Sequence, residues 1–235
     1  MGNRELILSE FQNVPENTLI MISELYNEKF SNQMSEAAFM QAISRLAKNG
    51  KIERVSKGIY CIPQKTRFGT VLPSDHEIAD LFISHGNGVL IGYGLYNSLG
   101  ITTQVSKRIL AYSSGIENQL KQIGNVTIQR CDLEYDDNTT AIIQMMELFY
   151  HYSEIQDLDH SAFLKCIENL AEKYDEEKFK EIQKNINYPK RAIAFLRQVL
   201  SYYNIPNNLG RYLSALSNYR IPKMEELYAA AQTSR

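Results

Sequence analysis

The chain has 235 residues, of which 44% are hydrophobic, and its 25 basic and 27 acidic side chains give a net charge of −2. This length allows one or two domains with a real core, and the near-neutral charge gives no general sign of a nucleic-acid partner. The three cysteines are widely spaced and form no CxxC motif, which argues against a disulfide framework or a zinc site and fits a reducing cytosol. No window approaches eighteen uninterrupted apolar residues, so we expect a soluble cytoplasmic protein without a membrane span.

Three helices are predicted in the first fifty residues. An apolar stripe at residues 6–11 predicts the first, which should end at Val14-Pro15. Pro15 suits the start of a second helix, whose apolar residues recur at helical spacing from Leu19 to Tyr26. Ser35 is a plausible N-cap for a third helix running to about Lys48 and ending at Asn49-Gly50. Its expected buried face consists of Phe39, Ala42, Ile43 and Leu46.

A hairpin follows the third helix. Residues 51–55 and 59–62 alternate as strands around Ser56-Lys57-Gly58, which is typical of a hairpin turn. The next segment, residues 63–74, contains two prolines and a glycine and shows little periodicity, so we place a domain boundary there. The order of helices and hairpin predicts a winged helix-turn-helix domain at residues 1–67.

The remainder of the chain divides into a mixed segment and a helical one. Residues 68–137 predict a small α/β segment, with helices at 74–84 and 93–99 and strands at 89–91, 108–112 and 126–131. Residues 138–235 read as almost entirely helical, and we expect them to pack with 68–137 as one domain. The expected helices lie at about 139–153, 160–172, 175–185, 189–203 and 206–217. The predicted fold class is therefore α+β and mainly helical.

Positive charge is concentrated in the N-terminal third. Residues 1–67 hold nine basic and seven acidic side chains, whereas 68–137 hold four and eight, and 138–235 hold twelve of each. Within 36–67, seven Lys and Arg face only one acidic residue after Glu36, a local excess that favours a polyanionic partner. The third helix would read the major groove, while the hairpin and the following linker would contact phosphates. The candidate DNA-binding residues are Ser35, Glu36, Gln41, Ser44, Arg45, Lys48, Arg54, Lys57, Lys65 and Arg67.

The alternative interpretation is a domain for protein contacts whose lysines are merely solvated. Glu36 favours that alternative, because a carboxylate at the groove would repel phosphate unless it accepted a hydrogen bond from a cytosine amino group.

Other sequence patterns give weaker indications of function than the basic N-terminal region does. The glycines of IGYGLYNSLG lack the third glycine of a dinucleotide fingerprint, since Asn97 stands there, and are better explained by close packing of a strand and a helix. The four histidines form no metal-binding spacing, and no nucleophile motif is present, so we expect no catalytic residues, cofactor or metal. Five C-terminal tyrosines alternate with basic residues and predict either helix packing or a second nucleic-acid or partner surface. They are Tyr188, Tyr202, Tyr203, Tyr212 and Tyr219, with Lys190, Arg191, Arg197, Arg211 and Arg220.

Two segments resemble the AbiEi-type antitoxins of bacterial type IV toxin–antitoxin systems. The first is RL-x-K-x-GKI-x-RV-x-KG-x-Y at Arg45–Tyr60, and the second is LG-x-TTQV at Leu99–Val105. The resemblance covers about residues 36–131. It implies a winged helix-turn-helix autorepressor that binds repeats in its own promoter and neutralises a neighbouring nucleotidyltransferase-like toxin. Neutralisation would belong to the region after the DNA-binding domain and need not involve a stable complex.

Three hypotheses follow. The leading one is a DNA-binding antitoxin and autorepressor without catalysis. The second is a stand-alone transcription regulator whose helical domain binds a ligand or a protein. The third, an enzyme acting on nucleic acid, lacks any visible metal-ligand or nucleophile cluster.

Overall fold

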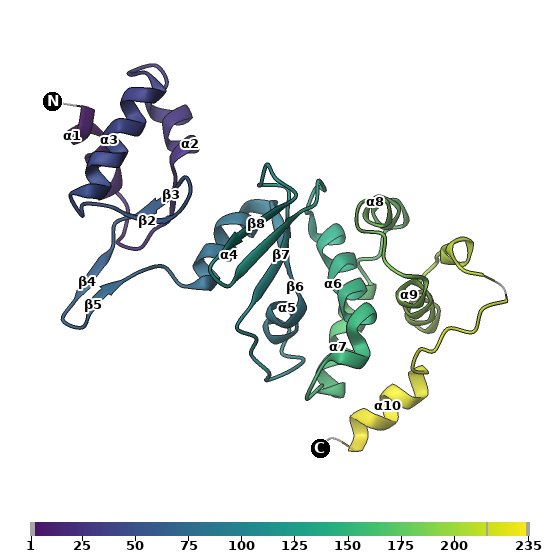
Figure 1. Ribbon diagram of the computed structural model, residues 1–235. Helices are drawn as coiled ribbons and strands as arrows, with labels where there is room; N and C mark the ends of the chain where they lie inside the picture. The colour runs from purple at the N-terminus through teal and green to yellow at the C-terminus, as the bar shows by residue number, and fades with distance from the viewer. Residues whose placement is uncertain (1–2, 215, 234–235) are drawn as a thin grey trace. The chain divides into compact units, whose positions relative to one another are not determined.

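The computed structural model describes residues 3–214 and 216–233, which divide into two compact units at Leu81–Phe82. The fold is mixed α/β and mainly helical, with a helical C-terminal region, as predicted (Figure 1). The first unit extends to Leu81, past the boundary expected after residue 67, because an unexpected second hairpin and most of the following helix are grouped with it. The second unit, Phe82–Arg235, contains the helical segment and the mixed segment from residue 82 onward, whereas residues 68–81 of the mixed segment belong to the first unit.

The N-terminal unit combines helices with two small sheets. Its helices are α1 (Asn3–Gln12), α2 (Ile22–Leu25), a π-helical turn at Tyr26–Phe30, α3 (Glu36–Lys48) and most of α4 (Asp75–Ile83). Its strands are β1 (Ile20–Met21), β2 (Glu53–Ser56), β3 (Ile59–Cys61), β4 (Gln64–Thr66) and β5 (Gly69–Val71). Strand β3 lies between β1 and β2 in an antiparallel three-stranded sheet, and β4 pairs only with β5.

The second predicted helix of this unit, expected to start at Pro15, begins later than predicted. Residues 15–19 form a turn, with Asn17 at a positive φ of 64°, and the chain becomes helical only at Ile22. Ile20 and Met21 instead extend along Tyr60 and Ile59 of β3. The apolar residues from Leu19 onward have helical spacing, so the local sequence does not indicate a strand. The strand forms by pairing with β3, which lies about forty residues further along the chain.

The core of the N-terminal unit forms around α3. Phe39 is fully buried, and its ring centroid lies 5.3 Å from that of Tyr26 and 5.3 Å from that of Phe30. Ile43 and Leu46 of the same helix are also fully buried, beside Ile7 and Phe11 of α1. The face of α3 that the sequence predicts to be buried is therefore confirmed.

The C-terminal unit has a four-stranded sheet in the order β6-β7-β9-β8, in which β7 and β9 are parallel and the other pairs antiparallel. The strands are β6 (Gly88–Ile91), β7 (Ile109–Ser113), β8 (Leu120–Ile123) and β9 (Val126–Arg130). Strand β8 is not among the predicted strands; its pattern is obscured because Leu120 and Gln122 face solvent. Gly88 allows β6 to approach β7 closely, since a Cβ there would overlap the carbonyl oxygen of Tyr112.

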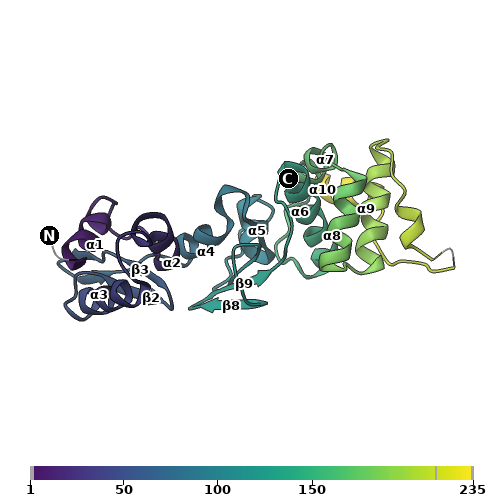
Figure 2. The ribbon, with the colours of Figure 1, turned by 90° about the horizontal axis from the view of Figure 1, so that it is seen from above.

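Helices complete the C-terminal unit (Figure 2). They are α5 (Gly92–Ser98), α6 (Asp137–His151), α7 (His160–Ala171), α8 (Glu176–Ile186), α9 (Lys190–Tyr202) and α10 (Met224–Thr233), with short 3-10 turns at Ser84–Gly86, Tyr152–Glu154 and Leu209–Tyr212. The long buried helix α6 carries Phe149, whose ring stacks on Phe195 of α9 at a centroid distance of 4.4 Å.

The predicted helix at 206–217 is wrong. Residue 215 lies outside the described residues, and the described part of this segment contains only the 3-10 turn at Leu209–Tyr212. The last helix, α10, begins later at Met224 and packs on α7 and α9. Leu213 and Ile221 lie against the core without helical structure, so their apolar character reflects packing of an extended segment.

Candidate nucleic-acid interface

Helix α3 has the ends that the sequence predicts. The Ser35 hydroxyl oxygen accepts a hydrogen bond from the backbone N–H of Ala38 at 3.3 Å, which caps the start of the helix. At the other end, Gly50 adopts a φ of +63°, a conformation that favours glycine. The helix is thus fixed at both ends as well as through its buried face.

All ten predicted DNA-binding residues are exposed. Within α3, Gln41, Ser44, Arg45 and Lys48 are spaced so that they share the face opposite Phe39 and Ile43. This face presents an amide, a hydroxyl, a guanidinium and an ammonium, which together can donate to base edges and phosphates. Glu36 adds one carboxylate at the first turn of the helix.

The first hairpin presents two further cations. Lys57 lies in the turn between β2 and β3, where Gly58 has a φ of +78°. Arg54 stands on β2 opposite the buried Tyr60, and its Nε donates to the carbonyl oxygen of Ser56 at 3.3 Å. Because that bond folds the Arg54 side chain along its own strand, Lys57 is the more freely extended cation of this hairpin.

The remaining two predicted residues, Lys65 and Arg67, lie on the second hairpin, β4–β5, rather than on an irregular linker. Lys65 pairs across the hairpin with Thr70, and Arg67 is in the two-residue loop at its tip. Phe68 beside it is not among the residues predicted from the sequence, although it is 86% exposed. The sequence does indicate this exposure. Phe68 stands between Arg67 and Gly69 in a segment of prolines and polar residues, without adjacent apolar residues that could form a core around it.

The cations of this region form no ion pairs with the other residues that the structure describes. Among the described residues, no ion pair involves the seven basic side chains of 45–67, namely Arg45, Lys48, Lys51, Arg54, Lys57, Lys65 and Arg67. Some basic residues elsewhere are paired, such as Lys29 with Glu10, and Lys178 with both Asp136 and Glu134. The pairing with Lys178 and capping of α6 lower the pKa of Asp136 to about 2.

The C-terminal tyrosines mostly pack. Tyr188 is buried, and its hydroxyl donates to the Glu147 carboxylate at 2.8 Å. Tyr203 and Tyr228 share a hydrogen bond between their hydroxyls at 3.1 Å, and the Arg211 guanidinium lies 4.9 Å from the ring centroid of Tyr212. These contacts favour the packing interpretation over a second nucleic-acid surface.

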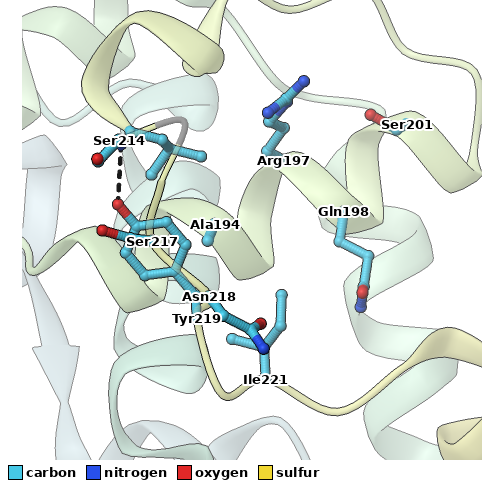
Figure 3. A pocket seen from close by; sticks show the side chains of 10 residues that line it. Ala194, Arg197, Gln198, Ser201, Ser214, Ser217, Asn218, Tyr219 and Ile221 are labelled. Atoms are coloured by element: carbon cyan, nitrogen blue, oxygen red, sulfur yellow. Dashed lines mark hydrogen bonds between the residues drawn. The ribbon is translucent and has the colours of Figure 1, made fainter.

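The C-terminal unit also contains an open, polar pocket of about 460 Å³ between α9 and the segment 213–221 (Figure 3). Arg197, Gln198 and Ser201 line it from α9. Across from them, the Tyr219 hydroxyl accepts a hydrogen bond from the backbone N–H of Ser214 at 3.0 Å. One cation among several hydroxyl and amide groups is a set that can bind a small anion.

The other candidate groups carry little reactivity. Burial raises the pKa of the Cys61 and Cys166 thiols to about 11, so both stay protonated near neutral pH. Gly92, in the glycine-rich segment, has a φ of +61° where β6 turns into α5, which explains a glycine there without any nucleotide.

Across residues 3–214 and 216–233, no three His, Cys, Asp or Glu side chains gather in a way that could hold a metal ion. No helix in the same residues is long and apolar enough to cross a membrane.

The chain was compared with protein families, curated proteins and solved structures. The crystal structure of the RV2827C protein from Mycobacterium tuberculosis is similar with a TM-score of 0.45 at 10% sequence identity, over 87% of this chain and 78% of that chain. No curated protein matches the chain. The profile of a family of unknown function, DUF6088, matches residues 7–146, which is more than half of the sequence. The chain therefore belongs to the DUF6088 family.

Proposed function

We propose that this protein is a cytoplasmic, DNA-binding transcriptional autorepressor that also acts as the antitoxin of a type IV-like toxin–antitoxin system. The observation that carries the DNA-binding half is the group of seven exposed cations from Arg45 to Arg67, which form no ion pair among the described residues, in a chain whose net charge is −2. An exposed surface with that many uncompensated positive charges attracts a polyanion, and its order of elements suits duplex DNA.

In this proposal the N-terminal unit is a winged helix-turn-helix. Helix α3 lies in the major groove, which is about 12 Å wide and admits one helix. Gln41, Ser44 and Arg45 contact base edges from its exposed face, and Lys48 reaches the backbone. Lys57, at the tip of the first hairpin, contacts phosphate and adds affinity without reading sequence.

The charge count sets the expected salt dependence. If all seven cations neutralised phosphates, the slope of log K against log salt would be about −6, since each contact contributes about −0.9 on duplex DNA. A smaller number of contacts gives a proportionally smaller slope. A binding constant independent of salt would contradict the proposal.

The direct test is a gel shift with the DNA upstream of the protein's own gene, at low salt and with a scrambled duplex as the control. We expect retardation of both duplexes and tighter binding of the natural sequence. Absence of any shift at low salt would overturn the DNA-binding half.

The antitoxin half rests on the resemblance of Arg45–Tyr60 and Leu99–Val105 to AbiEi-type antitoxins. In the second segment, Ile101 is buried, and its carbonyl oxygen accepts from the backbone N–H of Asp159 at 2.8 Å. The Thr102 hydroxyl donates to the carbonyl oxygen of Gln156 at 2.7 Å. This segment is thus held against the connection between α6 and α7, so the sheet and the helices must be tested together.

Co-expression with the product of the neighbouring gene tests neutralisation. A truncation after Asp137 is unsuitable, because α6 to α10 supply most of the core that the sheet shares. The full chain carrying both Arg45→Ala and Lys57→Ala serves better: expressed from an inducible promoter, it should lose repression and still rescue growth. Failure of the unmodified protein to rescue growth would overturn the antitoxin half and leave DNA binding intact.

A second candidate function is a transcription regulator controlled by a small ligand. The pocket with Arg197 and the hydroxyls of Ser201 and Ser214 favours it, because this group of donors suits a small anion. The gene neighbourhood discriminates the two: an adjacent nucleotidyltransferase-like gene favours the antitoxin, and its absence favours the regulator.

A further inference from the structure

The hairpin β4–β5 forms an exposed arm on the N-terminal unit (Figure 1). Every residue from 64 to 72 is exposed, and none of these side chains belongs to the buried core. An isolated two-stranded hairpin is at best marginally stable in water. This arm therefore contributes little to the core and is better explained by a partner.

The tip of the arm has a fixed conformation. The Thr66 hydroxyl accepts from the backbone N–H of Phe68 at 3.2 Å and donates to the carbonyl oxygen of Gly69 at 2.9 Å. The guanidinium carbon of Arg67 lies 4.6 Å from the centroid of the Phe68 ring. At the base, the Gln64 N–H donates to the side-chain oxygen of Asn17 at 3.2 Å, which ties the arm to the rest of the unit.

We propose that the β4–β5 arm enters the minor groove of the bound duplex, where Phe68 inserts as a wedge at a base step while Lys65 and Arg67 contact the flanking phosphates and groove. This inference rests on the proposed DNA binding and extends it to a second element. Apolar side chains inserted from the minor groove partly unstack a base step and kink the duplex. Arginine is attracted to the negative potential of a narrow minor groove.

The charge of the arm favours DNA over a protein partner. Residues 54–74 carry four cations, Arg54, Lys57, Lys65 and Arg67, and no carboxylate. A stable protein interface buries about 800 Å² on each partner, usually around a cluster of apolar anchors. The arm offers one fully projecting aromatic, with Val71 and Leu72 only 43% and 44% exposed near its base. A single projecting aromatic, Phe68, next to Lys65 and Arg67 suits a DNA groove better than a protein surface.

The chain contains no tryptophan, so Phe68→Trp would place a single fluorescent indole at the tip of the arm. If the ring enters a base step, adding the upstream duplex at low salt should quench this fluorescence and reduce its accessibility to acrylamide by several-fold. A minor-groove ligand such as netropsin should compete with the quenching. The matched control is Leu120→Trp, at a position 57% exposed on β8 of the other unit, which should be quenched little by the same duplex.

Affinity gives the second measurement. Phe68→Ala should weaken duplex binding on the order of tenfold, the usual scale for losing one aromatic–base stack, while Phe68→Trp should bind within about threefold of the unmodified protein. Because Phe68 is exposed, Phe68→Ala should leave the melting temperature unchanged.

The outcomes separate the two proposals. If the unmodified protein shifts duplex DNA while Phe68→Ala binds equally well and the indole at position 68 is not quenched, the arm inference is overturned and DNA binding stands. If netropsin leaves the quenching intact, the minor-groove placement is overturned. If the unmodified protein binds no duplex, both proposals fall. If Phe68→Ala abolishes growth rescue but not DNA binding, the arm serves a protein partner instead.

Discussion

The Glu147 carboxylate lies in the core of the C-terminal unit, where the residue is only 3% exposed. Its Oε1 accepts a hydrogen bond from the buried Tyr188 hydroxyl at 2.8 Å, and its backbone carbonyl accepts one from Tyr96 at 3.4 Å. Burial raises the pKa of this carboxyl above its ordinary value of 4.5, and the bond from Tyr188 opposes that rise. The hydrogen bond from Tyr188 therefore offsets part of the cost of burying a negative charge on this side chain of α6.

The sign of the resulting pH dependence is definite. A carboxyl whose pKa is higher in the folded state binds more protons when folded, so it lowers stability as the pH rises above its unfolded value of about 4.5. Glu147→Gln keeps an oxygen for the Tyr188 hydroxyl and cannot ionise. We expect this variant to be at least as stable as the unmodified protein at pH 7, and to lose less free energy of unfolding between pH 4.5 and 7.

Urea unfolding at several pH values measures this difference, and Tyr188→Phe provides the contrast. Without the phenol, the carboxylate loses its charge-neutral donor, and the free energy of unfolding at pH 7 should fall by about 1–3 kcal/mol. Identical pH profiles for Glu147→Gln and the unmodified protein would contradict the assignment.

Arg45 and Lys57 should differ in what their loss does to DNA binding. Arg45→Ala removes a side chain from the exposed face of α3 and should cost on the order of 1–3 kcal/mol of operator binding with relaxed specificity, if it holds a guanine. Lys57→Ala should weaken all duplexes about equally and reduce the salt slope by about 1. Binding titrations at several salt concentrations measure both effects, and Lys184→Ala, an exposed and unpaired lysine on α8, is the matched control. If Arg45→Ala lost the same affinity for operator and for scrambled DNA, Arg45 would have no role in base recognition.

At the scale of one element, α3 shows a residue with two assigned roles. Ser35 is predicted to contact DNA, and its hydroxyl also caps the helix by accepting from Ala38 N–H. Ser35→Ala should lower the stability of the N-terminal unit by about 1 kcal/mol, and Ser35→Asn should preserve it, because asparagine also caps. Thermal unfolding measures the stability that the Ser35 cap contributes, and the gel shift measures the contribution of Ser35 to DNA binding. Weaker DNA binding by Ser35→Asn at unchanged stability would assign the hydroxyl to DNA as well.

The elements that the sequence predicts well are those whose signals are local. Ser35 at the start of α3 and Asn49-Gly50 at its end fix that helix from neighbouring residues alone, and the turn at Lys57 does the same for β2–β3. The elements that it misses depend on distant partners. Strand β1 exists because β3 pairs with it, and Leu213 and Ile221 pack against a core formed largely by helices that precede them.

The candidate site divides in the same way. Exposure of Arg45 or Lys57 follows from helical spacing and turn chemistry, so it could be predicted from the sequence. The arm could not, because strands of three residues with polar side chains on both faces lack the alternation that indicates a strand. Phe68 therefore acquires a role only once the hairpin under it is known.

At the scale of the whole molecule, the described residues include two separate hydrophobic clusters, one in each unit. One consists of residues from α1 to β3, including Ile43, and the other extends from β6 to α10, including Ile193. Ile43 is fully buried and Ile193 is 1% exposed, so the two side chains report equally well on their cores. A separate core in each unit predicts two unfolding transitions in place of one.

Ile43→Val and Ile193→Val make the same chemical truncation, which costs about 0.5–1.5 kcal/mol at a buried site. Their effects on melting should nevertheless differ, because a small domain has the smaller unfolding entropy. We expect a shift of about 4–8 °C per kcal/mol in the unit that ends at Leu81, and about 2–4 °C per kcal/mol in the larger unit. Differential scanning calorimetry should show each variant lowering one transition and leaving the other in place. If both variants moved a single shared transition, the two cores would unfold as one cooperative unit, and separate variants of the N-terminal and C-terminal units could no longer be interpreted independently.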